Sequence, residues 1–124
     1  MSVTNLTAAD FESTILDNEI VLVDFWAPWC GPCRAFAPVF ERAAQDHHGV
    51  VFAKVDTQAE PALAATVNIR SIPTIMAFRE GILVYSQAGA MPKPALEDLI
   101  SQVERLDMAV VRAKIAERKA AASA

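Results

Sequence analysis

The sequence predicts an α/β fold with a central mixed sheet of about five strands, flanked by about four α-helices. Residues 20–27 form an unbroken apolar run rich in β-branched and aromatic types, which is typical of a strand covered on both faces. A second apolar run at 50–56 follows a stretch with helical periodicity, so the two strands should pair in parallel within a right-handed βαβ unit. Residues 74–87 contain two further strands in a hairpin, which adds antiparallel pairing.

The composition indicates one globular domain. The 124 residues are enough for one core, and 53% of them are hydrophobic against 21% charged. The net charge of −4 leaves no basic patch for nucleic acid or for an anionic membrane surface. No stretch approaches the ~20 apolar residues that span a bilayer, and the first residues lack the pattern of a secretory signal. We therefore expect a cytoplasmic protein.

The first helix is expected to begin at Thr7, a capping residue that has Asp10 three positions further on. A short strand around residue 3 precedes this helix, and residues 17–19 form a turn before the central strand. The apolar face of the helix should consist of Phe11, Ile15 and Leu16.

Both cysteines of the chain lie where the central strand passes into a helix. Pro28 and Trp29 end the strand, and Pro32 suits the first turn of the helix, because its missing N–H would be unpaired there in any case. Cys30 is therefore expected at or just before the helix N-terminus, and Cys33 about one turn inside it. At this spacing the two sulfurs can close a small disulfide with little movement of the backbone.

The helix N-terminus predicts a different role for each cysteine. Its free N–H groups and partial positive charge favour a thiolate at Cys30, and the thiolate is the attacking species in disulfide exchange. Cys30 is thus the candidate nucleophile, and Cys33 is the candidate thiol that resolves the mixed disulfide.

Zinc binding is the alternative for these cysteines, because thirteen residues separate Cys33 from His47. His47 and His48 are adjacent, however, rather than spaced as paired ligands. They also fall at the far end of the helix that the cysteines begin, roughly 20 Å from Cys33. We therefore predict no metal site.

The helix that begins at Pro32 is expected to reach about His47. Pro38 lies inside it and should kink it, and the alternative is that the helix stops there. A short helix at 60–66 follows the strand at 50–56, with Pro61 in its first position. The apolar stripe of the longer helix should consist of Phe36, Val39, Phe40 and Ala43.

Residues 74–78 and 82–87 should form the strands of the hairpin, and Gly81 in the turn between them can adopt a positive φ. An amphipathic helix follows Pro94 and completes a domain at residues 1–106. The apolar residues of this helix are Leu96, Leu99, Ile100, Val103 and Leu106.

Residues 107–124 extend beyond this domain. Asp107 is placed to cap a further helix, whose weak apolar stripe consists of Val110, Val111 and Ile115. Two interpretations of the extension stay open, namely a helical tail that frays and a helix that binds a partner.

Asp24 and Lys54 are charged residues inside the two apolar strands. An ionised carboxylate without partners is costly to bury, so Asp24 either pairs with Lys54 or holds a proton. Burial would raise the pKa of Asp24, and the charge of Lys54 would oppose that rise. Such a conflict between sequence and burial often marks a functional residue.

The segment from Trp26 to Cys33 resembles the active-site signature of the thioredoxin family. The resemblance extends from about residue 6 to about residue 106, through Asp24, Lys54, Ile72-Pro73-Thr74 and Gly89. It implies the thioredoxin fold and a protein-disulfide reductase that uses a reversible Cys30/Cys33 dithiol to maintain redox homeostasis and donate electrons to client proteins. It also implies a monomer without a bound cofactor, in which electrons come from NADPH through a separate flavoprotein, thioredoxin reductase.

The resemblance further implies roles for individual residues. Asp24 would assist deprotonation of Cys33 through water, with Lys54 tuning its charge. The Ile72–Pro73 bond would be cis and would face Cys30, leaving the Ile72 backbone free for an extended client strand. Gly31 and Pro32 complete the motif that positions the cysteines. Trp26 would pack in the core, and Trp29 would form exposed apolar surface for clients together with Gly89 and Ala90. Ile72 and Pro73 complete the predicted substrate-binding residues.

Two other functions stay open at this point. One is a disulfide oxidase or isomerase on the same fold, although the Gly31-Pro32 dipeptide resembles the reducing members of the family. The other is a non-enzymatic interaction subunit that docks through its extension. Arg34 and Pro28 flank the cysteines and should tune their reduction potential.

Overall fold

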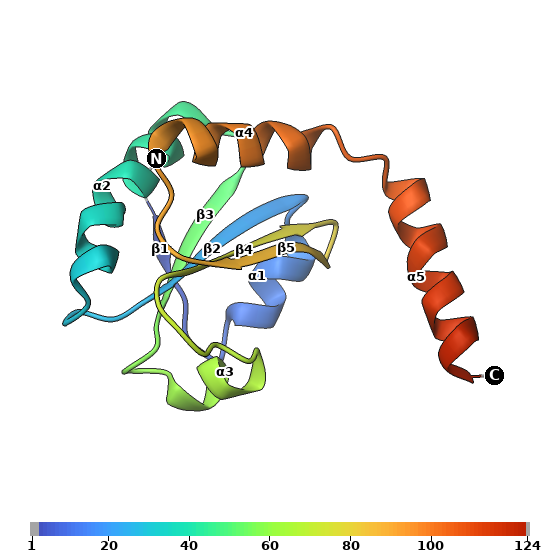
Figure 1. Ribbon diagram of the computed structural model, residues 1–124, viewed down its shortest axis with the longest axis horizontal. Helices are drawn as coiled ribbons and strands as arrows, with labels where there is room; N and C mark the ends of the chain where they lie inside the picture. Colours follow the sequence, from blue (N-terminus) through green and yellow to red (C-terminus); the bar gives the residue numbers. More distant parts are fainter. Residues whose placement is uncertain (1–2, 124) are drawn as a thin grey trace.

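The computed structural model describes residues 3–123, which form a mixed sheet between two layers of helices (Figure 1). The strands are β1 (Thr4–Asn5), β2 (Ile20–Trp26), β3 (Val51–Asp56), β4 (Thr74–Arg79) and β5 (Ile82–Ala88). The helices are α1 (Phe11–Asp17), α2 (Gly31–Asp46), α3 (Pro61–Thr66), α4 (Lys93–Glu104) and α5 (Met108–Ser123).

The five strands lie in the order β1-β3-β2-β4-β5. β3 pairs in parallel with both β1 and β2, whereas β4 pairs antiparallel with β2 and β5. The predicted mixed sheet of five strands, with its parallel β2–α2–β3 unit, is therefore confirmed. Four helices cover the sheet as expected, and α5 is a fifth helix in the extension (Figure 1).

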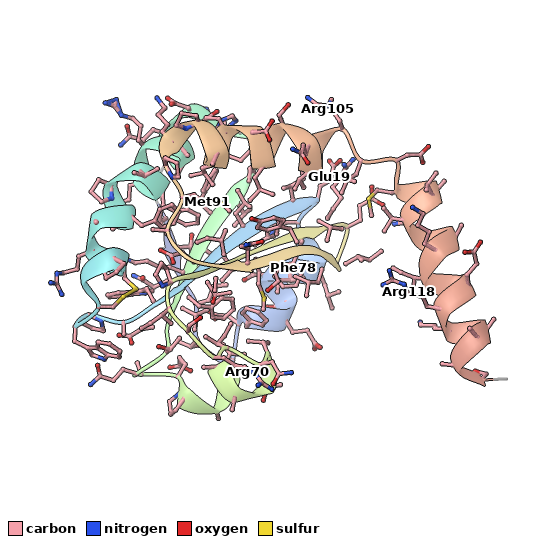
Figure 2. The ribbon with its side chains drawn as sticks, viewed as in Figure 1. Glu19, Arg70, Phe78, Met91, Arg105 and Arg118 are labelled. Atoms are coloured by element: carbon pink, nitrogen blue, oxygen red, sulfur yellow. A yellow bond between two sulfur atoms is a disulfide. The ribbon has the colours of Figure 1, made fainter. Side chains whose placement is uncertain are left out.

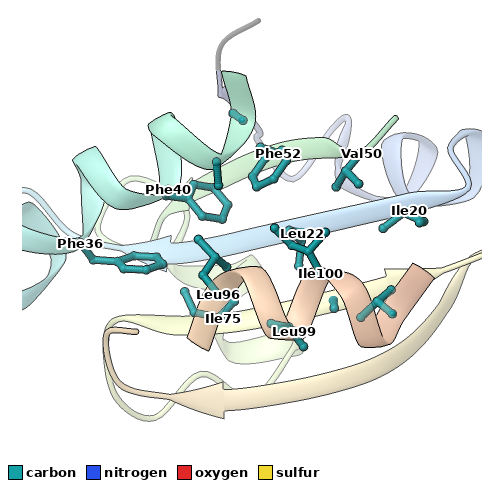
Figure 3. Close-up of a cluster of buried hydrophobic side chains, with 14 residues drawn as sticks. Ile20, Leu22, Phe36, Phe40, Val50, Phe52, Ile75, Leu96, Leu99 and Ile100 are labelled. Carbon is teal, nitrogen blue, oxygen red and sulfur yellow. The ribbon is translucent and has the colours of Figure 1, made fainter. Parts of the chain in front are cut away.

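Alternation along β2 explains why both faces of the sheet are apolar, because successive side chains point to opposite faces. Ile20 and Leu22 face α2 and α4, while Val21, Val23 and Phe25 belong to the cluster that α1 covers. Figure 3 shows the first cluster, whose buried members include Phe36, Phe40, Phe52, Ile75, Leu96, Leu99 and Ile100. The second cluster includes Phe11, Ile15, Ala53, Val55, Met76 and Phe78.

The start of the first helix differs from its prediction. Thr7 does not cap α1; the N-cap residue is Asp10, three positions later. The Asp10 carboxylate accepts hydrogen bonds from the Thr7 backbone N–H at 2.7 Å and from its hydroxyl at 3.2 Å, so this pair closes a separate turn. Leu16 is 64% exposed rather than part of the apolar face, because it lies about 100° around the helix from buried Ile15.

Helix α2 runs from Gly31 to Asp46 and continues through Pro38, so the alternative of a helix stop at this proline is wrong. Of the predicted stripe, Phe36, Phe40 and Ala43 are buried, and Val39 packs half-buried at the edge of the cluster. Helix α2 therefore packs along one side of the core, and the two cysteines lie at its N-terminus.

The hairpin turn between β4 and β5 contains two residues, Glu80 and Gly81, with φ values of 52° and 80°. Two successive positive φ angles are typical of a type I′ turn, which suits the right-handed twist of the strands. The prediction for Gly81 is confirmed. The turn is shorter than predicted, since Arg79 belongs to β4, and the positive φ of Glu80 was not predicted.

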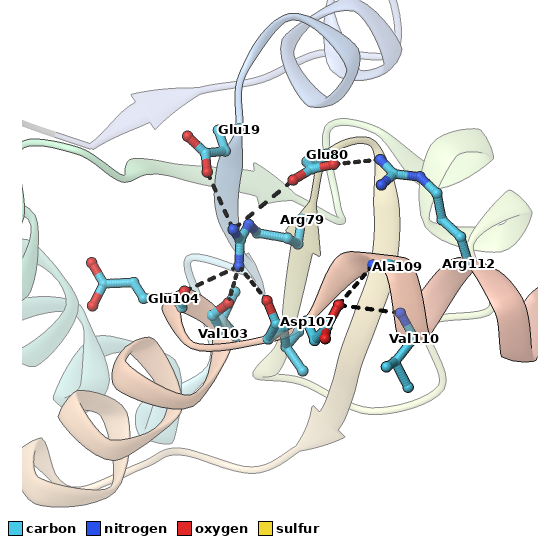
Figure 4. A network of polar contacts seen from close by, with 10 residues as sticks. Glu19, Arg79, Glu80, Val103, Glu104, Asp107, Ala109, Val110 and Arg112 are labelled. Atoms are coloured by element: carbon cyan, nitrogen blue, oxygen red, sulfur yellow. Dashed lines mark hydrogen bonds and ion pairs between the residues drawn. The ribbon is translucent and has the colours of Figure 1, made fainter.

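Arg79 joins the hairpin to the end of α4 (Figure 4). Its guanidinium donates to the carbonyl oxygens of Val103 at 2.7 Å and Glu104 at 3.2 Å, and it pairs with Glu19 at 3.3 Å. These carbonyls belong to the last turn of α4, whose acceptors have no partner within the helix. Leu106 lies beyond the end of α4, although it was predicted as part of that helix.

Asp107 caps α5 as predicted, because its carboxylate accepts the N–H groups of Ala109 at 3.0 Å and Val110 at 3.3 Å. An ion pair between Arg112 and Glu80 links α5 to the hairpin turn (Figure 4). Val110 is 48% exposed, so its predicted place in the apolar stripe is wrong. Met108 is buried instead, and an open cavity of about 200 Å³ separates α5 from β5, lined in part by Ile82, Val84, Val111 and Ile115.

Between residues 3 and 123, no helix is both long enough and apolar enough to cross a lipid bilayer.

Candidate active site

The loop after β2 is a tight turn from Ala27 to Cys30, in which the Cys30 N–H donates to the Ala27 carbonyl at 3.2 Å. Pro28 occupies the second position of this turn, where its fixed φ is suitable. Cys30 is the N-cap residue of α2, and Pro32 lies in the first turn of the helix. The predicted positions of both cysteines relative to the helix are therefore confirmed.

Cys30 and Cys33 form a disulfide, with their Cα atoms 5.2 Å apart. Figure 2 shows it as a yellow bond at the N-terminal end of α2. The Cys33 backbone N–H donates to Cys30 Sγ at 3.2 Å. Both residues are buried, and Cys30 is the more accessible at 5% exposure against 2% for Cys33. Hydrogen bonding to Sγ at a helix N-terminus favours a charged sulfur, so this geometry would favour a thiolate at Cys30 once the disulfide is reduced.

A second loop faces Cys30. The Ile72–Pro73 peptide bond is cis, as the resemblance implied, and the Ile72 carbonyl oxygen lies 3.9 Å from Cys30 Sγ. Pro73 is buried, and its carbonyl accepts the Gly89 N–H at 2.8 Å. Gly89 has a φ of 108°, a conformation that side chains disfavour, so glycine suits this close approach of β5 to the loop.

The surface around the disulfide is apolar and largely exposed. Trp29 is 68% exposed directly before Cys30, and both Gly89 and Ala90 are exposed. Ile72 packs half-buried against the two cysteines. The loop of Ile72 and Pro73 thus lies beside Cys30 and is joined to Gly89, but Pro73 itself is fully buried and is not part of the exposed surface.

Asp24 lies in the middle of β2, on the face that α2 covers, and is only 2% exposed. Burial raises the pKa of Asp24 from 3.8 to about 7, while the positive charge of Lys54 opposes the rise. Oδ1 of this carboxyl is buried without a hydrogen-bond partner. A group with a pKa near neutrality can take up or release a proton at physiological pH.

Lys54 is the register neighbour of Asp24 on β3, but no ion pair or hydrogen bond joins the two side chains in the part of the chain that the structure describes. The alternative in which Lys54 pairs directly with Asp24 is therefore wrong, although the positive charge of Lys54 still lowers the pKa of Asp24. The Lys54 ammonium lies 4.5 Å from the centre of the Trp26 ring instead. This cation–π contact was missed, although alternation already places Lys54 and Trp26 on the same face of adjacent strands.

The two histidines take part in other contacts. His47 Nε2 lies 2.7 Å from a carboxylate oxygen of Glu97 and thereby links α2 to α4, and His48 Nε2 lies 2.9 Å from the Gln45 carbonyl oxygen. Across residues 3–123 there is no group of three or more histidine, cysteine or acidic side chains that could hold a metal ion.

Comparison with known proteins places this arrangement in a family. The family model described as Thioredoxin matches residues 2–102. A Streptomyces coelicolor protein whose name includes thioredoxin 2 is 51% identical over 121 residues, covering 98% of this chain and 90% of the relative. The thioredoxin of Porphyra purpurea is 43% identical, covering 82% of this chain and 97% of its own length.

A solved structure agrees. A mutant thioredoxin from Halobacterium salinarum superimposes with a TM-score of 0.80 at 33% identity, covering 86% of this chain and 94% of the other. The expected fold and the expected thiol–disulfide chemistry are thereby confirmed. The chain belongs to the thioredoxin family, whose members are thiol–disulfide oxidoreductases acting on disulfide substrates.

Proposed function

We propose that the chain reduces disulfides in other proteins, with Cys30 as nucleophile and Cys33 as resolving thiol. The observation that supports this assignment most strongly is the hydrogen bond from the buried Cys33 N–H to Cys30 Sγ at the N-terminus of α2. It favours the thiolate on the more accessible of the two sulfurs.

The reaction has two exchange steps. In the first, the Cys30 thiolate attacks one sulfur of the client disulfide, the client S–S bond breaks, and a mixed disulfide to Cys30 forms as a client thiolate leaves. In the second, the Cys33 thiolate attacks Cys30 Sγ and expels the second client thiolate. The client gains two electrons and, with two protons, becomes a dithiol, while the enzyme becomes the Cys30–Cys33 disulfide seen here.

Asp24 assists the second step as the group that removes the Cys33 proton, through water. Its position below α2 and its pKa of about 7 support this role, because the carboxylate form is present at neutral pH. Lys54 modulates that pKa by its charge rather than by a direct bond. It also holds the Trp26 ring, which packs against the cysteines.

Clients dock as extended chains over exposed Trp29, Gly89 and Ala90 and along the backbone of Ile72, while buried Pro73 shapes the loop beneath them. The exposure of Trp29 and the small side chains at 89 and 90 support recognition of backbone rather than of one sequence. Gly31 and Pro32 keep the cysteines at their spacing. The protein acts as a cytoplasmic monomer without a bound cofactor, and NADPH supplies its electrons through a separate flavoprotein reductase.

Cysteine variants test this proposal. Reduced Cys33→Ser should attack insulin and accumulate as a mixed disulfide, since the resolving thiol is missing, whereas Cys30→Ser should neither reduce insulin nor form the adduct. The adduct is counted by mass spectrometry under non-reducing conditions. Accumulation of the adduct in Cys30→Ser but not in Cys33→Ser would reverse the assigned roles, and turnover by Cys30→Ser would show that the chain acts in another way.

A further inference from the structure

The side chain of Arg34 forms a hydrogen bond to the loop that precedes α2. Its guanidinium Nη1 donates to the Pro28 carbonyl oxygen at 3.0 Å, reaching back six residues from α2 onto the turn that carries Trp29. Among the residues that the structure describes, Arg34 is the one residue in the body of α2 whose side chain donates a hydrogen bond to this turn.

The Pro28 carbonyl belongs to the central peptide of the turn closed by the Cys30 N–H and the Ala27 carbonyl. Type I and type II turns differ mainly by a flip of this central peptide, and a type II turn needs a positive φ at the third position, here Trp29. Trp29 has no positive φ, so the central peptide has the type I orientation that a non-glycine residue prefers. The hydrogen bond from Arg34 on α2 adds to this preference, because it holds the Pro28 carbonyl in that orientation.

The charge of Arg34 is also unusual for its place. It lies in the first turns of α2, where the helix dipole favours acidic side chains and disfavours basic ones, and no acidic residue occupies the first turn. Arg34 is exposed and forms no ion pair with any residue that the structure describes. Helix stability does not account for an arginine here, whereas the bond to Pro28 does.

We infer that Arg34 is a positioning residue for client docking, which acts by fixing the Pro28–Trp29 peptide and with it the exposed Trp29 beside the nucleophile. This inference rests on the proposed function, because it assumes that protein clients dock over Trp29. Arg34 itself takes no part in the exchange of thiols and disulfides.

The test compares three variants in the full chain. Arg34→Met removes the donor and the charge but keeps an unbranched apolar stem, and Arg34→Lys keeps both the charge and a donor. Arg42→Met makes the same chemical change at an exposed arginine two turns further along α2. We expect Arg34→Met to raise the KM for insulin about fivefold with kcat nearly unchanged, as one lost hydrogen bond would. Arg34→Lys should restore most of the loss, and Arg42→Met should behave as the parent chain.

A small neutral substrate separates docking from chemistry. In Arg34→Met the rate with hydroxyethyl disulfide, which is too small to cover Trp29, should fall clearly less than the kcat/KM for insulin, because loss of the charge can affect both substrates through the cysteines but loss of docking affects only insulin. The backbone amide of Trp29, followed by 15N relaxation, should become more mobile in Arg34→Met only. An unchanged KM together with an unchanged Trp29 amide would overturn the inference, as would an equal loss of rate with hydroxyethyl disulfide.

The two proposals fail in different ways. If the parent chain does not reduce insulin, the proposed function is wrong, while the Trp29 amide still reports whether Arg34 fixes the turn. If the parent chain reduces insulin and Arg34→Met does so with the same KM, only the role of Arg34 is wrong.

Discussion

At the scale of single residues, the fold buries the Asp24 carboxyl and leaves one of its oxygens without a hydrogen-bond partner. Asp24 is buried in β2, and Oδ1 has no hydrogen-bond partner, so desolvation raises its pKa to about 7. The nearby Lys54 lowers the pKa only in part, because its ammonium lies over the ring of Trp26. This side chain therefore reduces stability at neutral pH, and the role proposed for it in resolving the mixed disulfide would account for its presence.

We predict that Asp24→Asn makes the oxidised protein more stable at pH 8 and changes it little at pH 4. The pKa of Asp24 is near its ordinary value of 3.8 in the unfolded chain and about 7 in the folded one, so folding is penalised increasingly as pH rises between these values. The penalty is then constant above the folded pKa and amounts to about 4 kcal/mol in the free energy of unfolding. Urea denaturation across this pH range measures it, and a constant difference between the two proteins would contradict the assignment.

The same variant should slow resolution of the mixed disulfide, because Cys33 loses its proton acceptor. The slowing should be largest near pH 7 and should shrink above pH 9, where hydroxide and buffer deprotonate the thiol. Stopped-flow release of a client from the mixed disulfide measures this step. Equal release rates across the pH range would remove Asp24 from the mechanism.

Residue types and spacing were sufficient to predict the cysteine pair, its position on the helix and the burial of Asp24. The contacts of long side chains were not predictable in this way. Lys54 can reach either Asp24 or Trp26 from the same backbone position, and Arg34 can point to solvent or to Pro28. Which partner each long side chain takes depends on the packed structure around it.

At the scale of elements, the apolar pattern predicted where each strand and helix lies, and errors occurred at their ends and edges. Leu16 and Val110 are apolar by type yet exposed, since the 3.6-residue period of a helix turns them away from the buried face. The capping of α4 by Arg79 was not predicted, because that arginine comes from a strand 24 residues earlier than its acceptor Val103. Local sequence carries no signal of such a distant cap.

The hairpin turn provides a prediction at this scale. Gly81→Ala should lower the free energy of unfolding by about 1–2 kcal/mol, because φ is 80° there and an added Cβ would lie 3.1 Å from a methyl group of Leu16. Gly49→Ala is the matched control, since an added Cβ meets nothing within 4 Å there. Its stability should be unchanged or slightly raised. Equal effects of the two substitutions in urea denaturation would contradict the assigned turn.

At the scale of the whole molecule, the two cysteines and the hairpin turn that contacts α5 lie at opposite ends of the sheet. The cysteines follow the C-terminal end of β2, whereas Arg79, at the turn end of β4, pairs with Ile20 at the N-terminal end of β2. Helix α5 is tied to that turn through Arg112 and Glu80, far from the disulfide (Figures 1 and 4). The extension was predicted as helical, but its direction away from the domain was not, because its apolar stripe is too weak to specify a packing partner.

Removal of residues 108–124 should therefore leave insulin reduction unchanged to within about twofold. Stability should fall by about 2 kcal/mol, because buried Met108 and the Arg112–Glu80 pair are lost. Met108→Ala in the full chain tests the packing contribution alone. A truncated protein that stays stable but loses its activity on insulin would instead favour the interpretation of α5 as a helix that binds a partner.

The most direct test of the reductase assignment is the reduction potential of the Cys30/Cys33 couple, measured by equilibrating the purified protein in defined glutathione buffers and counting free thiols. We predict a potential more reducing than that of the glutathione pool, near the ~−270 mV typical of thioredoxin. A protein with this potential can pass electrons to client disulfides. A potential near the ~−120 mV of a strong oxidant would mean that the dithiol is the stable form, and the chain would then donate disulfides instead of reducing them.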